Sequence, residues 1–176
     1  CRTDRHRGVR PRLGERVYLA QTASVIGDVH LGDDVSVWYN SVVRGDCNSI
    51  RIGDRTNVQD NCAIHVTQAR YSTVLEEEVT LGHGAIVHGA IVRKGALIGI
   101  RATVLDGADV GESAFIGAGA LVVPRTVVPA RTLWLGAPAK LARPLTDEEV
   151  EDLKHFHRNY LVYKREAVEA GEAWAR

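Results

Sequence analysis

The chain has 176 residues, of which 45% are hydrophobic, and this is enough for one well-buried core and a single domain. Lys and Arg together number 22, as do Asp and Glu, so the charge balance gives no field that would favour a nucleic-acid partner. No stretch approaches the roughly 18 apolar residues of a membrane span and the first residues form no apolar leader, so we expect a cytoplasmic protein without a membrane partner.

Residues 1–16 show no repeat and form an N-terminal segment. Because the chain contains no Met, residue 1 need not be the start of translation. Three cysteines, Cys1, Cys47 and Cys62, are too few and too widely spaced for a disulfide framework or a thiolate zinc site. Cys62 is expected to be a small apolar residue of the core.

Residues 17–136 repeat with a period of six. An aliphatic residue recurs at every sixth position in three successive frames, and a small residue or Thr stands four positions after most members of the last frame. The aliphatic series are Leu19, Val25, Leu31, Val37 and Val43, then Ile52, Val58 and Ile64, and then Ile86, Val92, Ile98, Val104, Val110, Ile116, Val122 and Val128. The small positions are Ala90, Ala96, Ala102, Ala108, Ala114, Ala120 and Thr126.

A helix would need apolar spacing near 3.6 and a continuous strand spacing near 2, so a period of six predicts short strands separated by turns. Three such sides close a triangular coil of about 18 residues. We therefore predict an all-β solenoid, a left-handed parallel β-helix of about six to seven coils, with the aliphatic positions stacked inward.

A connector at residues 137–145 contains two prolines, and we predict a helix over residues 146–172. Thr146 and Glu149 form a capping box at its start, and acidic residues in the first turn favour the positive end of the helix dipole. The predicted apolar stripe is Val150, Leu153, Phe156, Tyr160, Leu161 and Tyr163. About 24 residues would span roughly 36 Å, enough to run back along the whole solenoid.

Three of the seven histidines, His65, His83 and His88, fall on consecutive stretches of the coil beside small residues. His65 and His88 are 23 residues apart, which is one coil of about 18 plus five, and a loop at residues 67–73 could absorb those five. They would then stack on one face. The other four histidines are not expected to bind metal: His6, His30, His155 and His157.

His83 lies five residues before His88, close to one side of the triangle, so it should point from a neighbouring face. It could join the pair only in another copy, which a three-fold trimer would supply. Three imidazoles with a fourth position open are typical of catalytic zinc. A set of stacked histidines without metal remains the alternative.

Five motifs together resemble those of the γ-class carbonic anhydrases of the compact, loop-deleted kind, over a match from about Arg12 to the C-terminal helix. They are Val37–Asp46 (VWYNSVVRGD), Ile52–Asn61 (IGDRTNVQDN), Ile64–Val66 (IHV), Leu81–Gly89 (LGHGAIVHG) and Leu133–Lys140 (LWLGAPAK). The resemblance implies reversible hydration of CO2 to bicarbonate by a zinc-bound hydroxide at a subunit interface. It also implies a homotrimer that binds Zn2+, with Fe2+ or Co2+ possible.

The same resemblance implies roles for individual residues. His65 and His88 would come from one chain and His83 from the next. By position, Arg44 and Asp46 resemble a pair that links subunits beside the metal. Gln59 resembles the residue that hydrogen-bonds the metal-bound water, and Tyr160 would reach over the site.

Two positions depart from the family pattern. Cys47 stands where active members have Glu, and the acidic loop expected over residues 67–78 is short, with Glu76, Glu77 and Glu78 as the acidic residues available. Both features are tied to proton transfer. Two alternatives therefore stay open: a non-catalytic metal-binding trimeric scaffold or complex subunit, and a hexapeptide-repeat acyltransferase, which shares the prism but uses one catalytic His.

Overall fold

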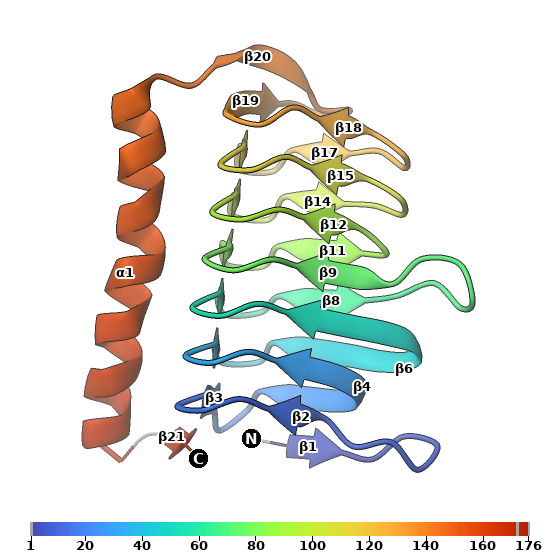
Figure 1. Cartoon of the computed structure of the whole chain (residues 1–176), viewed down its shortest axis with the longest axis vertical. Coiled ribbons are helices and arrows are strands. Elements are labelled where there is room, and N and C mark those ends of the chain that lie inside the picture. Colours follow the sequence, from blue (N-terminus) through green and yellow to red (C-terminus); the bar gives the residue numbers. More distant parts are fainter. Residues whose placement is uncertain (1, 172, 176) are drawn as a thin grey trace.

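In the computed structural model, which describes residues 2–171 and 173–175, the chain forms a left-handed parallel β-solenoid of about seven turns with one C-terminal helix (Figure 1). The described strands form a 12-stranded and a 9-stranded sheet. The first of these bends into two faces, because the long strands β4 (Ser24–Leu31) and β6 (Val42–Ile52) turn a corner and pair with different partners at their two ends. The prism therefore has three faces, as the six-residue period predicts.

The faces are named here A, B and C. Face A holds the first halves of β4 and β6 with β1 (Arg2–Asp4), β8 (Ala63–His65), β11 (Ile86–His88), β14 (Thr103–Val104) and β17 (Leu121–Val122). Face B holds the second halves of β4 and β6 with β2 (Arg12–Leu13), β9 (Thr73–Leu75), β12 (Ile91–Val92), β15 (Asp109–Val110) and β18 (Val127–Val128).

Face C is the 9-stranded sheet. Its parallel strands are β3 (Tyr18–Ala20), β5 (Ser36–Val37), β7 (Asn57–Val58), β10 (Thr80–Leu81), β13 (Leu97–Ile98), β16 (Phe115–Ile116) and β19 (Thr132–Leu135). Antiparallel strands pair at its two ends, β20 (Lys140–Pro144) with β19 and β21 (Ala173–Ala175) with β3. The sheet pairing begins before residue 17, since β1 and β2 both pair with β4.

The core is a stack of inward aliphatic side chains, one from each side of every coil. On face A the ladder runs in register through Val25, Val43, Ile64, Val87, Val104 and Val122, each no more than 1% exposed. Burying each of these side chains contributes about 1.5–3 kcal/mol. The predicted inward position of Ile86 is wrong: Ile86 is 41% exposed and Val87 points inward. Val92 follows Val87 by five residues, whereas the corresponding inward positions of the next coil, Val104 and Val110, are six apart, so the frame shifts there.

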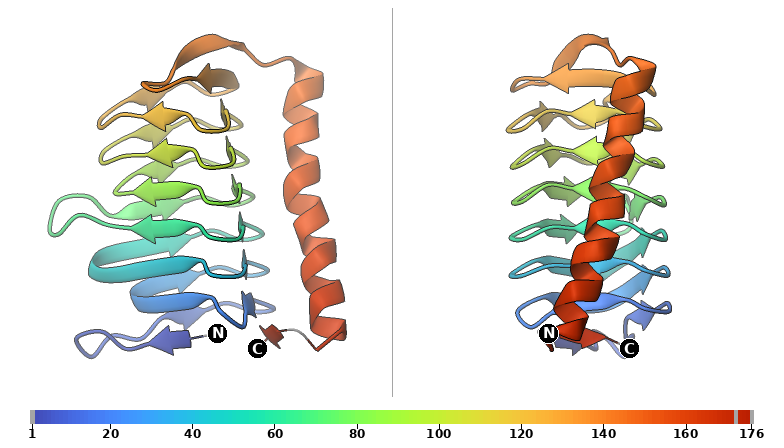
Figure 2. Two further views of the ribbon diagram at one scale, coloured as in Figure 1. Left: turned by 180° about the vertical axis from the view of Figure 1, so that it is seen from behind. Right: turned by 90° about the vertical axis from the view of Figure 1, so that its left-hand side faces the viewer.

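Helix α1 (Asp147–Glu169) runs back along the solenoid (Figure 2). The predicted capping box is confirmed, with the Thr146 hydroxyl accepting from the Glu149 backbone N–H and the Glu149 carboxylate accepting from that of Thr146. The predicted stripe is wrong at Phe156 and Tyr163, which are 45% and 48% exposed. The buried side chains of the helix are Leu153, His157, Lys164 and Ala167. No helix in the described part of the chain is long and apolar enough to cross a membrane.

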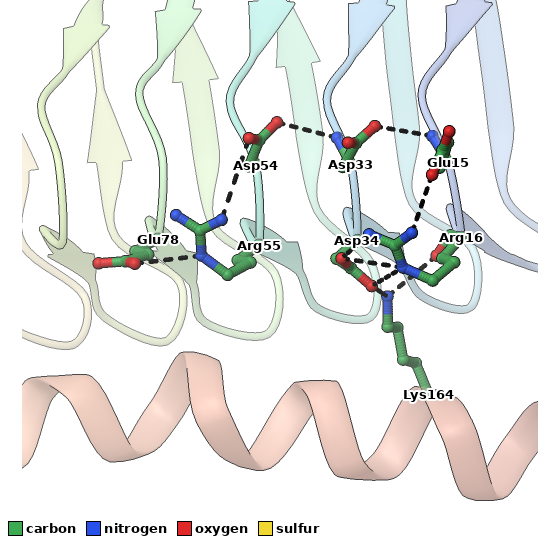
Figure 3. A network of polar contacts seen from close by, with 8 residues as sticks. All are labelled: Glu15, Arg16, Asp33, Asp34, Asp54, Arg55, Glu78 and Lys164. Carbon is green, nitrogen blue, oxygen red and sulfur yellow. Dashed lines mark hydrogen bonds and ion pairs between the residues drawn. The ribbon is translucent and has the colours of Figure 1, made fainter.

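Alternating charges connect successive coils at the corner beneath the helix. Arg16 donates through Nε and Nη2 to the carboxylate of Asp34 one coil above, and Arg55 donates through Nε to Glu78 on the coil above its own (Figure 3). Lys164 of α1 donates to the same Asp34 carboxylate at 2.7 Å. These contacts hold successive coils together and attach α1 to the solenoid.

Candidate metal centre

Two of the predicted ligands, His65 and His88, lie side by side at the edge of face A. Strands β8 and β11 pair in parallel with His65 opposite His88, so the predicted stacking is confirmed. The residues that make this coil longer form a turn after β8, closed by a 2.9 Å hydrogen bond from the Thr67 N–H to the Tyr71 carbonyl. The Nδ1 atom of His65 lies 3.0 Å from the Nε2 atom of His88.

In each ring one nitrogen, here called the inner one, faces the other histidine, and the second, the outer one, faces a carboxylate. Nε2 of His65 lies 2.9 Å from Oδ1 of Asp46, and Nδ1 of His88 lies 2.6 Å from Oδ1 of Asp106. An ionised carboxylate only accepts hydrogen bonds, so each outer nitrogen carries the proton and, in the neutral rings, the two inner nitrogens present lone pairs to each other. Hydrogen bonds of this kind from histidine to a carboxylate are usual behind metal ligands.

Two lone pairs 3.0 Å apart repel unless a cation or a proton lies between them. In a tetrahedral zinc site with Zn–N bonds of 2.0–2.1 Å, two ligand nitrogens lie about 3.3 Å apart. The geometry of His65 and His88 therefore fits a divalent metal with imidazole ligands. Imidazole donors suit Zn2+, Fe2+ and Co2+ better than Mg2+ or Ca2+.

The predicted pair Arg44 and Asp46 lies directly behind His65. Arg44 donates to Oδ2 of Asp46, while Oδ1 of the same carboxylate accepts from His65. Burial raises the pKa of Asp46, but the hydrogen bonds from His65 and Arg44 outweigh this effect and hold the pKa well below its usual range. Asp46 is therefore charged at neutral pH and keeps the proton of His65 on Nε2.

Cys47 lies beside the same pair. Ligand atoms of Asp46, Cys47 and His65 lie within 4.8 Å of one another, and this is the one such group of three or more found among the described residues. Burial and the neighbouring Asp46 carboxylate raise the pKa of the Cys47 thiol, so it is protonated at neutral pH. Cys62, by contrast, is buried in the core as predicted.

His83 stands on another part of the surface. It follows β10 of face C, and none of the contacts found among the described residues joins it to His65 or His88. Its Nδ1 atom lies 2.8 Å from a carboxylate oxygen of Asp60, and its side chain is 45% exposed. His83 thus has a carboxylate partner like the other two, and no contact of its Nε2 atom is found among the described residues.

Gln59 and Tyr160 lie near His83. All three line a cavity of about 400 Å³ between face C and α1, whose other walls include Leu97, Phe115 and Phe156. Gln59 is 5% exposed and donates through Nε2 to the Asn57 side chain, which leaves its carbonyl oxygen as an acceptor. Burial raises the pKa of Tyr160 to about 12, so its hydroxyl stays protonated.

The predicted site residues therefore fall into two groups in the single chain. Arg44, Asp46, His65 and His88 lie at the edge of face A, and Gln59, His83 and Tyr160 line the cavity next to α1.

A relative from Geobacillus kaustophilus named "Carbonic anhydrase" is 42% identical over 156 residues, which cover 89% of this chain and 85% of the relative. This chain belongs to the γ-class carbonic anhydrase family. A second family member, "Gamma carbonic anhydrase 2, mitochondrial" from Arabidopsis thaliana, is 42% identical over 86% of this chain, and the match spans only 56% of that protein's length. No family model matches the chain.

Solved structures with the same fold carry other names. A "hexapeptide transferase family protein" from Anaplasma phagocytophilum is 35% identical and superposes with a TM-score of 0.88 over 93% of this chain and 96% of that one. Membership of the γ-class carbonic anhydrase family implies a metal cofactor in general. It does not by itself identify the metal or the reaction of this chain.

The carboxylates Asp60 and Asp106 were not predicted from the sequence as part of the site. A signal for Asp106 existed, because it follows His88 by 18 residues, which is one coil. Asp60 precedes His83 by 23 residues, the same interval that separates His65 from His88, and the two are opposite each other across one longer coil. Both could have been found by applying the coil length to each histidine in turn.

Proposed function

We propose that this chain is a metal-dependent carbonic anhydrase that hydrates CO2 reversibly to bicarbonate at sites shared between neighbouring copies. The proposal includes Zn2+ as the metal, with Fe2+ or Co2+ able to take its place. The observation that carries it is the pair of lone pairs on His65 Nδ1 and His88 Nε2, each fixed by a carboxylate behind its ring.

The third ligand in this proposal is His83 of a neighbouring copy. A second observation supports a contact between copies at face A. The outward positions next to the histidine row, Val42, Ala63 and Ile86, are in register and exposed, and the two larger side chains are 36% and 41% exposed. An apolar row of this kind beside a half-complete metal site favours burial against a second copy. A cyclic arrangement of three copies would complete three equivalent sites.

A bound Zn2+ would supply Lewis acidity that lowers the pKa of a water molecule towards 7. The side chains of the chain provide the rest. Gln59 offers a carbonyl oxygen from a buried amide, which can orient a water molecule by accepting a hydrogen bond from it. Leu97, Phe115 and Phe156 give the cavity apolar walls, which suit an uncharged, poorly hydrated substrate such as CO2.

A second candidate function, a non-catalytic metal-binding trimeric scaffold or complex subunit, is favoured by one residue. Cys47 carries a protonated thiol beside His65, where the family pattern has a Glu that can move a proton. This candidate predicts the same metal and the same trimer but no turnover. An acyltransferase, in contrast, predicts activity that survives removal of the metal.

The proposal is tested by metal analysis of the purified protein together with stopped-flow CO2 hydration. We expect about one Zn2+, Fe2+ or Co2+ per chain after dialysis, and hydration that His83→Ala abolishes. The matched control is His155→Ala, an exposed histidine of α1 outside the site, which should keep both metal and activity. Metal without hydration above the His83→Ala level would support the scaffold. Absence of stoichiometric metal would contradict both.

A further inference from the structure

The two carboxylates behind the metal ligands are held in different ways. Asp46 shares its charge with the guanidinium of Arg44. Asp106 has a neutral partner instead, the hydroxyl of Thr67, which donates to Oδ2 at 2.7 Å while Oδ1 accepts from His88. Thr67, Asp106 and His88 thus form a short chain of hydrogen bonds that ends at the Nε2 lone pair of His88.

Thr67 belongs to the turn Thr67–Tyr71, which protrudes between β8 and β9 (Figure 1). The turn is fixed at several points. Asn48, on the strand that carries Asp46, donates to the Thr67 carbonyl at 3.1 Å. At the other end the Arg70 guanidinium lies 5.2 Å from the centre of the Tyr71 ring.

Tyr71 packs against the backbone next to both members of the His88–Asp106 pair. Gly89 follows His88 and Gly107 follows Asp106, and both adopt positive φ angles, of 60° and 70°. A Cβ atom would approach Tyr71 to 2.8 Å at Gly89 and 2.9 Å at Gly107, which is closer than packed carbon atoms tolerate. A 2.7 Å hydrogen bond from the Gly107 N–H to the Gly89 carbonyl joins the two coils at this point.

We propose that the Thr67–Tyr71 turn positions His88 as a metal ligand: Thr67 orients Asp106, and Asp106 keeps the His88 proton on Nδ1 so that Nε2 stays free for the metal. Thr67 and Asp106 are positioning residues, since they act through His88. This inference rests on the proposed function for the identity of the site. It concerns metal affinity and ring tautomer, which can be measured whether or not the protein hydrates CO2.

The test compares four variants of the full chain. Thr67→Val keeps the size of the side chain and removes the donor, while Thr67→Ser restores it. Asp106→Asn removes the charge and offers an amide NH2 to His88 Nδ1, which favours the opposite tautomer. The matched control is Thr126→Val in the exposed turn one coil further on, because the Thr126 hydroxyl bonds the carbonyl of Val123 and no side-chain contact found among the described residues joins it to Asp106 or His88. Thermal unfolding confirms that each variant is folded.

Zn2+ affinity is measured by competition with a chromophoric chelator. We expect Asp106→Asn to weaken this affinity by about 10- to 100-fold, the usual effect of removing a residue that hydrogen-bonds a metal ligand. Thr67→Val should weaken it by about 2- to 10-fold, the range of one hydrogen bond. Thr67→Ser and Thr126→Val should leave the affinity unchanged. The visible spectrum of the Co2+ form should change only in Asp106→Asn and Thr67→Val.

Nitrogen NMR of the metal-free protein with 15N-labelled histidine gives an independent readout. We expect His88 to carry its proton on Nδ1 in the wild type and to populate the other tautomer in Thr67→Val and Asp106→Asn. Unchanged Zn2+ affinity and tautomer in both variants would overturn the inference and leave the proposed function standing. Wild-type protein that binds Zn2+ without hydrating CO2 would overturn the function and leave the inference standing.

Discussion

At the residue scale, a contact between a ring nitrogen and a carboxylate distinguishes the candidate ligands from the other histidines. His65, His83 and His88 each lie within 2.9 Å of a carboxylate oxygen through one ring nitrogen. Among the described residues, none of the remaining four histidines has such a contact. The support fixes which nitrogen carries the proton, so the free nitrogen of each ring is chosen before any metal arrives.

The burial of His157 leads us to predict that the stability of the fold depends on pH. Burial lowers the pKa of His157 below its usual 6.5, so the unfolded chain binds this proton at a higher pH than the folded chain. Stability should therefore rise with pH between the lowered pKa and about 6.5, and this contribution should be constant at higher pH. Unfolding midpoints at pH 5.5 and 7.5 should differ less in His157→Gln than in the wild type.

The control for this prediction is His155→Gln on the same helix, whose side chain is exposed. It should show the wild-type difference between the two pH values. An equal loss of stability at low pH in the wild type and in His157→Gln would contradict the assignment.

The placement of His65 opposite His88, with His83 on another face, could be predicted from the coil length, because the spacing of the three depends only on the repeat and on one extra loop. Cys62, at the inward side of a turn, was also predictable. The partners Asp60 and Asp106 follow from the same arithmetic once the register is known. The outward orientation of Ile86 could not be predicted, because both Ile86 and Val87 are aliphatic and the six-residue series continues unbroken through the shortened turn after His88.

At the element scale, the capping box of α1 was readable from the sequence because it is local. The face that α1 buries was not, since Lys164 and His157 enter the interface while the aromatic Phe156 and Tyr163 stay exposed. A lysine can be buried only where it finds partners, and those partners, Asp34 and the Arg16 carbonyl, are more than 100 residues away in the sequence. Hydrophobic periodicity contains no information about such contacts.

Lys164 predicts a measurable contribution to the docking of α1. Its side chain is 9% exposed and its Nζ atom donates to Asp34 at 2.7 Å and to the Arg16 carbonyl at 2.9 Å. Lys164→Met should lower the free energy of unfolding by about 1–3 kcal/mol, between the values for exposed and buried ion pairs, because Arg16 still neutralises Asp34. Chemical denaturation measures the difference.

Lys154→Met is the matched control on the same helix, because Lys154 pairs with Glu151 on the exposed side. Its effect should stay within about 0.5 kcal/mol. Equal effects of the two substitutions would show that the Lys164 contacts do not hold the helix.

At the scale of the whole molecule, the solenoid is predictable because each coil repeats the same inward pattern. The site is less so, because its two halves lie on different faces of one chain: His65 and His88 at the edge of face A, and His83 with Gln59 beside α1. In our proposal each copy contributes one half to each of two sites. The metal centre then exists only in the assembly, and dissociation would destroy it.

The most direct test of this central claim mixes two inactive variants. His65→Ala keeps His83, and His83→Ala keeps His65 and His88, so neither variant alone can form a complete site. In a cyclic trimer every mixed assembly regains one of three sites, and random mixing at equal amounts should restore about one quarter of the wild-type metal and hydration. Recovery to that level after joint unfolding and refolding is the predicted result. No recovery, with mixed trimers confirmed by mass spectrometry, would contradict a site shared between neighbouring chains.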